Sequence, residues 1–204
     1  MNIPKLKALE SAFFKQYPGG FESDELKRIV KRHKVGKLND MAQEVLSKEA
    51  LASPDALKGI RKLISTSTMV SVYEKVPFRD LLDEADELLA NNIVHAIYDL
   101  IHGDQESGFE QLVSLLAPYK LAKWPILTVL LTYYHPTEEV FVKPTTVKKI
   151  IQHLELENLT YTPKPNYAFY QEYRRQFLEL TKQVDPALSE TNGHFSGFLM
   201  MTLK

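Results

Sequence analysis

The chain has 204 residues, a near balance of 25 Lys and Arg against 26 Asp and Glu, and no cysteine. An apolar content of 44%, with ten Phe and ten Tyr, is enough for a hydrophobic core and excludes global disorder. The absence of cysteine excludes disulfides, thiolate nucleophiles, zinc–thiolate sites and iron–sulfur clusters. The chain has no apolar leader and no apolar run of about 18 residues, so we expect a cytoplasmic protein without membrane segments.

The charges are segregated along the chain. Residues 1–75 carry 14 basic and 9 acidic side chains, residues 76–110 carry 1 and 9, and residues 111–204 carry 10 and 8. The net charges of these segments are therefore +5, −8 and +2. Such segregation creates local potentials that attract an anion at one face and a basic partner at another.

Apolar residues recur three and four positions apart in the first third of the chain, which is typical of helices. They predict three helices, at residues 6–17, 24–33 and 39–46. The breakers Pro18-Gly19-Gly20 end the first helix, and Gly36 interrupts after the second. Ser53-Pro54-Asp55 predicts another helix start, because Ser accepts from free N–H groups, Pro fits the first helical position and Asp complements the helix dipole.

The middle of the chain continues the helical period. Residues 78–101 form either one long helix or two in succession, with Asn91-Asn92 between their apolar sets, and end at Gly103. A further helix at 109–116 is closed by Pro118. Residues 124–134 are apolar nearly all round, which indicates a helix buried in the middle of the domain.

The last third holds shorter elements. Val140-Phe141-Val142 is a brief extended piece, and Pro144 begins a helix that reaches Leu154. The Pro-rich connector 162–166 leads into a helix at 170–184. We therefore predict an all-α fold of about eight to ten helices, as a single globular domain over residues 1–204 around the buried central helix at about 124–134. Residues 66–77 are the one candidate for a subdomain boundary.

Two charged runs follow helical spacing. Lys27, Lys31 and Lys34 share a face that could track a phosphate backbone, although a merely solvated face is the favoured interpretation because the whole chain is near neutral. Asp80, Glu84 and Glu87 share another face. A metal site there would need ligands from other elements, so an exposed polar face is again favoured.

No catalytic or metal motif stands out. His95, Asp99 and His102 share a helix face, but helix capping and dipole effects explain them equally well. Ser65-Thr66-Ser67-Thr68 lacks the strand–turn–helix context of a serine nucleophile, and no P-loop or dinucleotide fingerprint occurs. We expect no bound metal and no cofactor.

The most distinctive stretch runs from Tyr119 to Lys149. It combines a lysine-flanked turn, Trp124, the buried helix, the extended link and a basic helix start. The side chains that would converge on an anion, if the helices at Pro125 and Pro144 start side by side, are Lys120, Lys123, Lys143, Thr145 and Lys148. The alternative is that Trp124 belongs to the core and the lysines are solvated.

About 35 residues of this stretch resemble the helix-hairpin-helix DNA glycosylase superfamily, in which a hairpin precedes a buried helix and a catalytic Asp follows it. Here Lys120-Leu121-Ala122-Lys123 replaces the glycine hairpin, and Lys143-Pro144 stands where the Asp would be. The resemblance therefore implies the helices without glycosylase chemistry. The whole chain also resembles an uncharacterised bacterial protein family, which implies no activity.

The function that we predict is a non-catalytic helical domain that binds nucleic acid or another phosphate-bearing partner through basic helix termini. One alternative is a protein-interaction or structural module in which Tyr and Phe of residues 161–177 cover the core and present a partner surface. The other is an enzyme of unidentified class, for which the sequence offers no defensible set of catalytic residues.

Overall fold

The computed structural model describes residues 1–203 and every side chain among them except that of Arg32. Within this range there are twelve α-helices and three short 3₁₀ helices, and there is no β-strand. The α-helices are α1 (Ile3–Gln16), α2 (Asp24–His33), α3 (Val35–Val45), α4 (Lys48–Leu51), α5 (Ala56–Thr66), α6 (Val72–Glu84), α7 (Glu87–His102), α8 (Gln105–Leu116), α9 (Trp124–Tyr134), α10 (Pro144–His153), α11 (Tyr167–Thr181) and α12 (Asn192–Thr202). The all-α prediction is confirmed, with more helices than expected.

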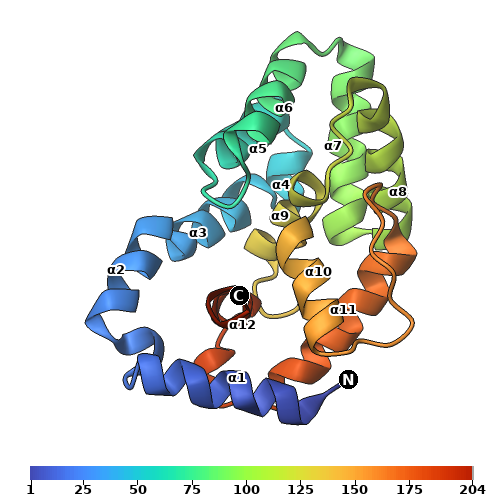
Figure 1. Ribbon diagram of the computed structural model, residues 1–204. Coiled ribbons are helices and arrows are strands. Elements are labelled where there is room, and N and C mark those ends of the chain that lie inside the picture. Colours follow the sequence, from blue (N-terminus) through green and yellow to red (C-terminus); the bar gives the residue numbers. More distant parts are fainter. Residues whose placement is uncertain (204) are drawn as a thin grey trace.

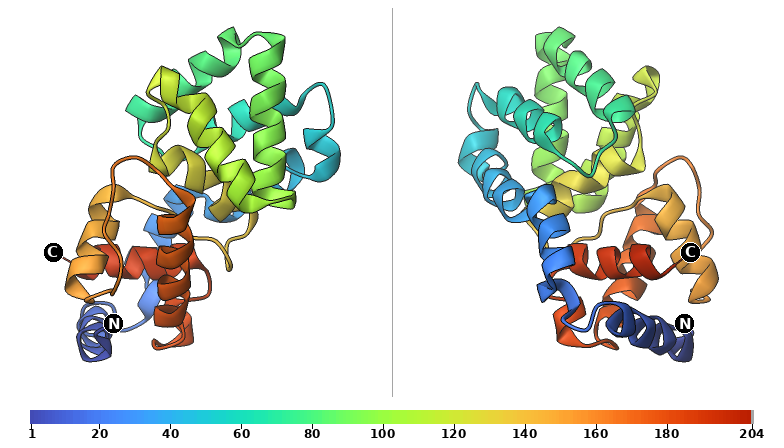
Figure 2. Two further views of the ribbon diagram at one scale, coloured as in Figure 1. Left: turned by 90° about the vertical axis from the view of Figure 1, so that its right-hand side faces the viewer. Right: turned by 60° about the vertical axis from the view of Figure 1, so that its left-hand side comes forward.

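The helices form two groups, one above the other in Figure 1. Helices α4 to α8 make the upper group, and α1, α2, α10, α11 and α12 make the lower group. Helix α9 lies between the groups, and α3 packs against α5 and α9 (Figures 1 and 2). One continuous hydrophobic core runs through both groups.

Helix α9 is the centre of this core, as predicted. All of its residues except Tyr134 are buried, and Leu127 and Leu130 have no exposed surface. The hydroxyl groups of its two threonines form hydrogen bonds within the helix. Thr128 donates to the Trp124 carbonyl and Thr132 donates to the Thr128 carbonyl, each at 2.7 Å. The helix can therefore be buried all round without leaving an unpaired hydroxyl group.

The first two helices lie close to the predicted ranges, whereas α3 begins at Val35, four residues before the predicted start, and two of the sequence signals act differently. Helix α2 ends at its C-cap Lys34, which adopts a left-handed conformation with a φ of 51°, whereas Gly36 lies inside α3. Helix α5 is present where Ser53-Pro54-Asp55 predicts it, but it begins at Ala56 with Asp55 as its N-cap. The Ser53 hydroxyl instead donates to the Ala50 carbonyl at 2.8 Å, at the end of the unpredicted helix α4.

Residues 72–102 form two helices, and the division is not at Asn91-Asn92. Helix α6 begins with a capping box between Ser71 and Glu74, and α7 begins at Asp86, whose carboxylate accepts from the Leu89 N–H at 2.8 Å. The asparagines lie inside α7 because the chain uses Asp86 as its N-cap, five residues before Asn91. Residues 67–71 link α5 to α6, and these two helices pack on each other.

Helices α7 and α8 form the most extensive helix pair in the described chain. Gly108 lets α8 approach the α7 backbone, because a Cβ atom at this position would lie 2.2 Å from the Leu100 nitrogen.

At the other end of the chain, the sequence analysis did not predict α12, although Phe195, Phe198 and Leu199 are fully buried there. Helix α12 packs against α1, α10 and α11 and completes the lower group.

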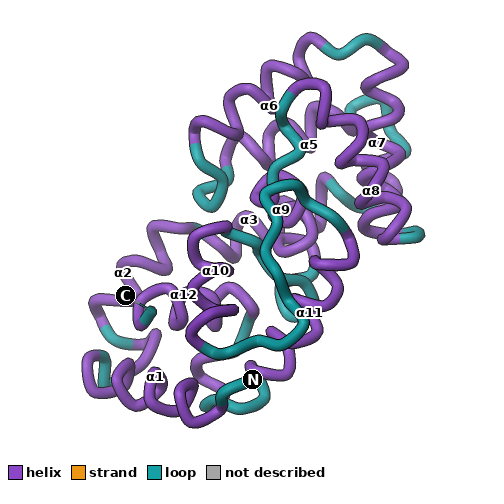
Figure 3. Tube along the Cα trace, turned by 45° about the vertical axis from the view of Figure 1, so that its right-hand side comes forward, coloured by secondary structure: helices purple, strands orange, loops and turns teal. Residues whose placement is uncertain are grey.

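The extended link 140–143 runs back along α9. The Val142 N–H donates to the Thr128 hydroxyl at 3.0 Å, so the start of α10 lies near the first turns of α9. The loop before α11 runs across the face shown in Figure 3. None of the helices described over residues 1–203 combines the length and the apolar character that crossing a membrane requires.

Candidate functional site

The strongest surface feature of the molecule is a run of positive charge along α2 and the start of α3. Residues 27–37 contain six Lys and Arg, one His and no acidic residue. We use the name basic strip for the exposed cations Lys27, Arg28, Lys31, Lys34 and Lys37. Because α2 lies on the outside of the lower group in Figure 1, these charges face solvent rather than another helix.

Among the described side chains of α2, one is buried in the core. Leu26 is 1% exposed and Val30 is half-buried, whereas Ile29 is 39% exposed. Helix α2 is strongly amphipathic, but its apolar side is narrow and nearly all of its surface is polar. The helix therefore adds little to the core and presents its cations on a broad outer face.

The basic strip is largely without counter-charge inside the protein. Lys27 pairs with Glu22 at 2.9 Å, and this hydrogen bond raises the pKa of Lys27. Among the described side chains, Arg28, Lys31, Lys34 and Lys37 form no ion pair. Four neighbouring cations without internal partners produce a local positive potential that an external polyanion can neutralise.

The C-terminal end of α2 adjoins the 67–71 loop. The Thr68 hydroxyl donates to the His33 carbonyl at 3.3 Å and lies 3.1 Å from its Nδ1. Ser67 anchors this loop, because its buried hydroxyl lies 2.9 Å from the Tyr133 hydroxyl of α9 and accepts from the Met69 N–H. The loop therefore fixes α2 to the central helix at this one end.

The second predicted anion site lies at the starts of α9 and α10. Lys123 is the N-cap of α9 and Lys143 the N-cap of α10, and neither cap makes a side-chain hydrogen bond. The first residues of α9, Trp124 to Ile126, are buried, so their N–H groups do not face solvent. At α10, in contrast, Thr145 is exposed, which leaves only this helix start accessible to an anion.

The remaining lysines of this set have separate surroundings. The Lys148 ammonium lies 4.7 Å from the centre of the Tyr161 ring, and the next residue, Thr162, accepts from the Trp124 indole N–H at 2.8 Å. Lys148 and the start of α9 thus touch adjacent residues of one loop. Lys120 is exposed in a left-handed turn with φ 59°, before α9. Convergence of all five side chains on one anion stays a prediction.

A buried carboxylate was missed by the sequence analysis. Glu139 is 4% exposed and forms an ion pair with Arg174. Its carboxylate also accepts from the Tyr170 hydroxyl at 2.6 Å and from the Gln105 amide at 2.8 Å. Burial and the charge of Glu139 raise the pKa of Tyr170 well above its ordinary value.

This Glu139 cluster joins the two helix groups. Gln105 comes from α8 in the upper group, Tyr170 and Arg174 come from α11 in the lower group, and Glu139 lies on the link between α9 and α10. The carboxylate is 4% exposed and accepts from three side chains of two distant helices, so we assign the cluster a structural role. The sequence shows the four-residue spacing of Tyr170 and Arg174, which places them on one helix face. Their partner Glu139 lies more than 30 residues earlier in the chain, so the cluster is not visible in the sequence.

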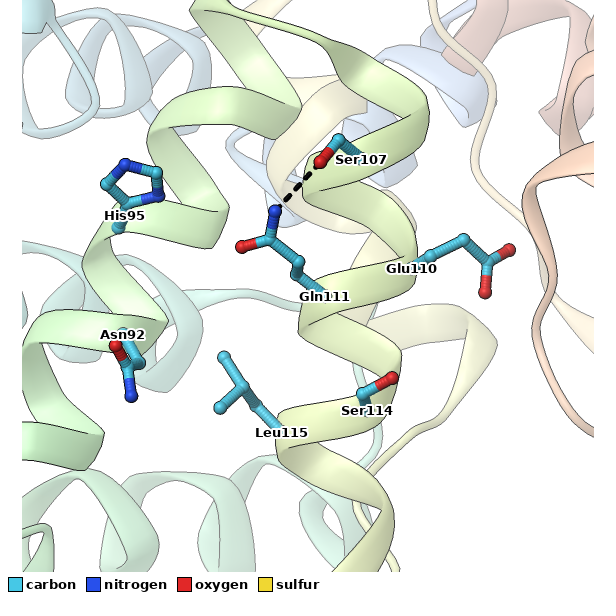
Figure 4. Close-up of a pocket in the computed structure, with 7 residues that line it drawn as sticks. All are labelled: Asn92, His95, Ser107, Glu110, Gln111, Ser114 and Leu115. Carbon is cyan, nitrogen blue, oxygen red and sulfur yellow. Dashed lines mark hydrogen bonds between the residues drawn. The ribbon is translucent and has the colours of Figure 1, made fainter.

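An open groove with a volume of about 420 Å³ lies between α7 and α8. Figure 4 shows the side chains that line it: Asn92, His95, Ser107, Glu110, Gln111, Ser114 and Leu115. Gln111 donates to Ser107 at 2.8 Å, and Glu110 accepts from the Tyr167 N–H at 2.6 Å. Gln111 and Ser107 thus bond to each other, and Glu110 bonds to a residue outside the groove.

The histidine face on α7 does not converge on a metal. His95 lies 3.3 Å from Asp99, but His102 is turned to the Leu46 carbonyl at 2.7 Å. A search of residues 1–203 for three or more His, Asp or Glu side chains arranged to hold a metal ion finds none.

The acidic face expected from Asp80, Glu84 and Glu87 is divided between two helices. Asp80 pairs with Arg79 on α6 at 2.7 Å, whereas Glu87 lies beyond the turn, at the start of α7. The three carboxylates therefore do not share one helix face, because α6 ends at Glu84. This turn lies at the end of the molecule opposite α2 (Figures 1 and 2).

The aromatic residues expected to present a partner surface at 161–177 are mostly buried. The core includes Tyr167, Phe169, Tyr170, Tyr173 and Phe177, whose rings pack against one another and against Phe109 and Trp124. Comparison with protein-family models, curated proteins and solved structures found no match to this chain. The candidate site therefore stands on its own geometry and charge.

Proposed function

We propose that this protein is a non-catalytic helical domain that binds the phosphate backbone of nucleic acid through the basic strip. The observation that carries the proposal is the run of six Lys and Arg without an acidic residue at 27–37, on α2 and the start of α3, where Leu26 is the one buried residue among the described side chains of α2. Phosphate contacts by Lys and Arg supply most of the affinity of sequence-independent binding.

The near-neutral net charge of −1 does not oppose this function. The acidic residues of 76–110 belong to α6, α7, the turns that follow them and the start of α8, in the upper group of helices, whereas α2 lies in the lower group (Figure 1). At physiological ionic strength, charges separated by more than about 8 Å of solvent are largely screened from each other. The basic strip therefore acts on a nearby polyanion as a local cationic surface.

The test is a titration of labelled 20-nucleotide DNA and RNA, followed by fluorescence anisotropy at several salt concentrations. If four cations contact phosphates, the logarithm of the affinity falls with the logarithm of salt with a slope of about −3 to −4. Lys31→Glu weakens binding to all sequences and reduces the magnitude of this slope by about 1. The control is Lys164→Glu, the same change at an exposed lysine on the loop before α11, which leaves binding unchanged. Absence of binding at low salt would refute the proposal.

A second contact for the same function is the start of α10, with Lys143, Thr145 and Lys148, together with Lys120 and Lys123 nearby in the sequence. The supporting observation is the accessible helix start without a side-chain cap, next to Lys143. Lys143→Glu and Lys148→Glu reduce affinity if this contact is used. If neither variant changes the affinity, the basic strip is sufficient and the second contact is excluded.

A further inference from the structure

Tyr73 is the most exposed large hydrophobic side chain in the described part of the protein, with 88% of its surface accessible. It is the second residue of α6, and its neighbour Val72 is 55% exposed. The capping box of Ser71 and Glu74 fixes the backbone on both sides of it. A tyrosine held so far out of the core on a rigid helix start presents both faces of its ring to solvent.

Tyr73 follows a loop that contacts the C-terminal end of α2, so the chain limits its distance from the basic strip. Thr68 contacts His33 at the end of α2, and Tyr73 is five residues further along the chain. Even a fully extended chain of five residues spans at most about 18 Å, so this bound holds whatever path the loop takes. The hydrogen bond between Ser67 and Tyr133 anchors the start of this loop on α9.

We infer that the basic strip and Tyr73 together bind single-stranded nucleic acid, with the phosphates on the cations of α2 and a base stacked on the Tyr73 ring. This inference rests on the proposed function and names its substrate class. A duplex hides the faces of its bases, whereas a single strand offers them to any aromatic side chain beside its backbone. Tyr73 therefore adds affinity for single strands and adds none for duplexes.

An anionic membrane is the main competing polyanion for a basic amphipathic helix. Such a helix binds a membrane by inserting its apolar face into the lipid. In α2 the apolar side is turned toward the protein through Leu26, and Ile29 is only partly exposed. The structure thus favours a strand with stacking bases over a lipid surface.

The experiment compares a labelled 20-nucleotide single strand with the duplex of the same sequence. Tyr73→Ala lowers single-strand affinity by roughly 5- to 150-fold, the range for loss of one stacked base, and leaves duplex affinity unchanged. Tyr73→Phe retains the single-strand affinity because it keeps the ring. Tyr119→Ala, at the other exposed tyrosine, is the matched control and has no effect.

A second measurement reads stacking directly. In Tyr73→Trp the new indole is exposed, whereas the native Trp124 is buried, so quenching by the single strand reports the new indole. Single-strand binding that is insensitive to Tyr73→Ala, without quenching in Tyr73→Trp, would overturn the inference and leave the proposed function intact. Binding to neither nucleic acid refutes both, and binding only to vesicles of anionic phospholipid identifies a membrane surface instead.

Discussion

Helices α9 and α2 have nearly the same length, 11 and 10 residues, but opposite relations to the core. Helix α9 carries no charged residue and is buried on every side, whereas Leu26 is the only buried residue among the described side chains of α2. Stability therefore depends on α9 and its neighbours. The charges of α2 can be changed without loss of packing, so binding and folding are separable by mutation.

The largest expected effect is on α9. Leu130→Asp places an unpaired carboxylate in a site without exposed surface, which costs several kcal/mol. We expect loss of soluble folded protein, measured by expression yield and by far-ultraviolet circular dichroism. Lys31→Asp introduces the same side chain on α2 and leaves the unfolding transition unchanged. A folded Leu130→Asp protein with native stability would show that α9 is not the centre of the core.

The next effect concerns the Glu139 cluster, which joins the two helix groups. Arg174→Met leaves a buried carboxylate without its ion-pair partner, which lowers the free energy of unfolding by about 3–5 kcal/mol in chemical denaturation. Adding Glu139→Gln to this variant removes the uncompensated charge and restores part of the loss. If the double variant is no more stable than Arg174→Met, the charge of Glu139 is not the cause.

The smallest effect is at the surface of α11. Hydrogen bonds from Arg175 and Gln176 lower the pKa of Glu172 from 4.5 to about 2. Since the folded state holds this carboxyl ionised more strongly than the unfolded state, its contribution to stability is complete above pH 4.5 and declines as the pH falls toward 2. Denaturant titrations between these values should show a weaker pH dependence in Glu172→Gln, and an unchanged dependence would contradict this assignment.

The sequence predicted the fold class and the buried centre because apolar periodicity records burial directly. Residues 124–134 are apolar on every side, and only a buried helix satisfies that pattern. The helix boundaries were harder to predict than the fold class, because several residues that can end or start a helix lie close together in the sequence. At the α2–α3 joint, Lys34 adopts the left-handed conformation although Gly36, two residues later, is the better suited residue.

The candidate site was only partly predictable. The cations of α2 are visible as a run in the sequence, and their exposure follows from the single strong apolar anchor at Leu26. No pattern in the sequence indicated that Tyr73 belongs to the site. Its position relative to α2 depends on the contact between Thr68 and His33, which are 35 residues apart in the chain. Glu139 was missed for the same reason, since its partners come from α8 and α11.

The most direct test of this separation between a folding centre and a binding surface is hydrogen exchange, measured with and without a bound 20-nucleotide single strand. We predict added protection in peptides that cover residues 24–38 and 67–76, and unchanged exchange in α9, which is already protected by burial. Added protection confined to residues 143–149, or spread over α9 without change at α2, would contradict the account.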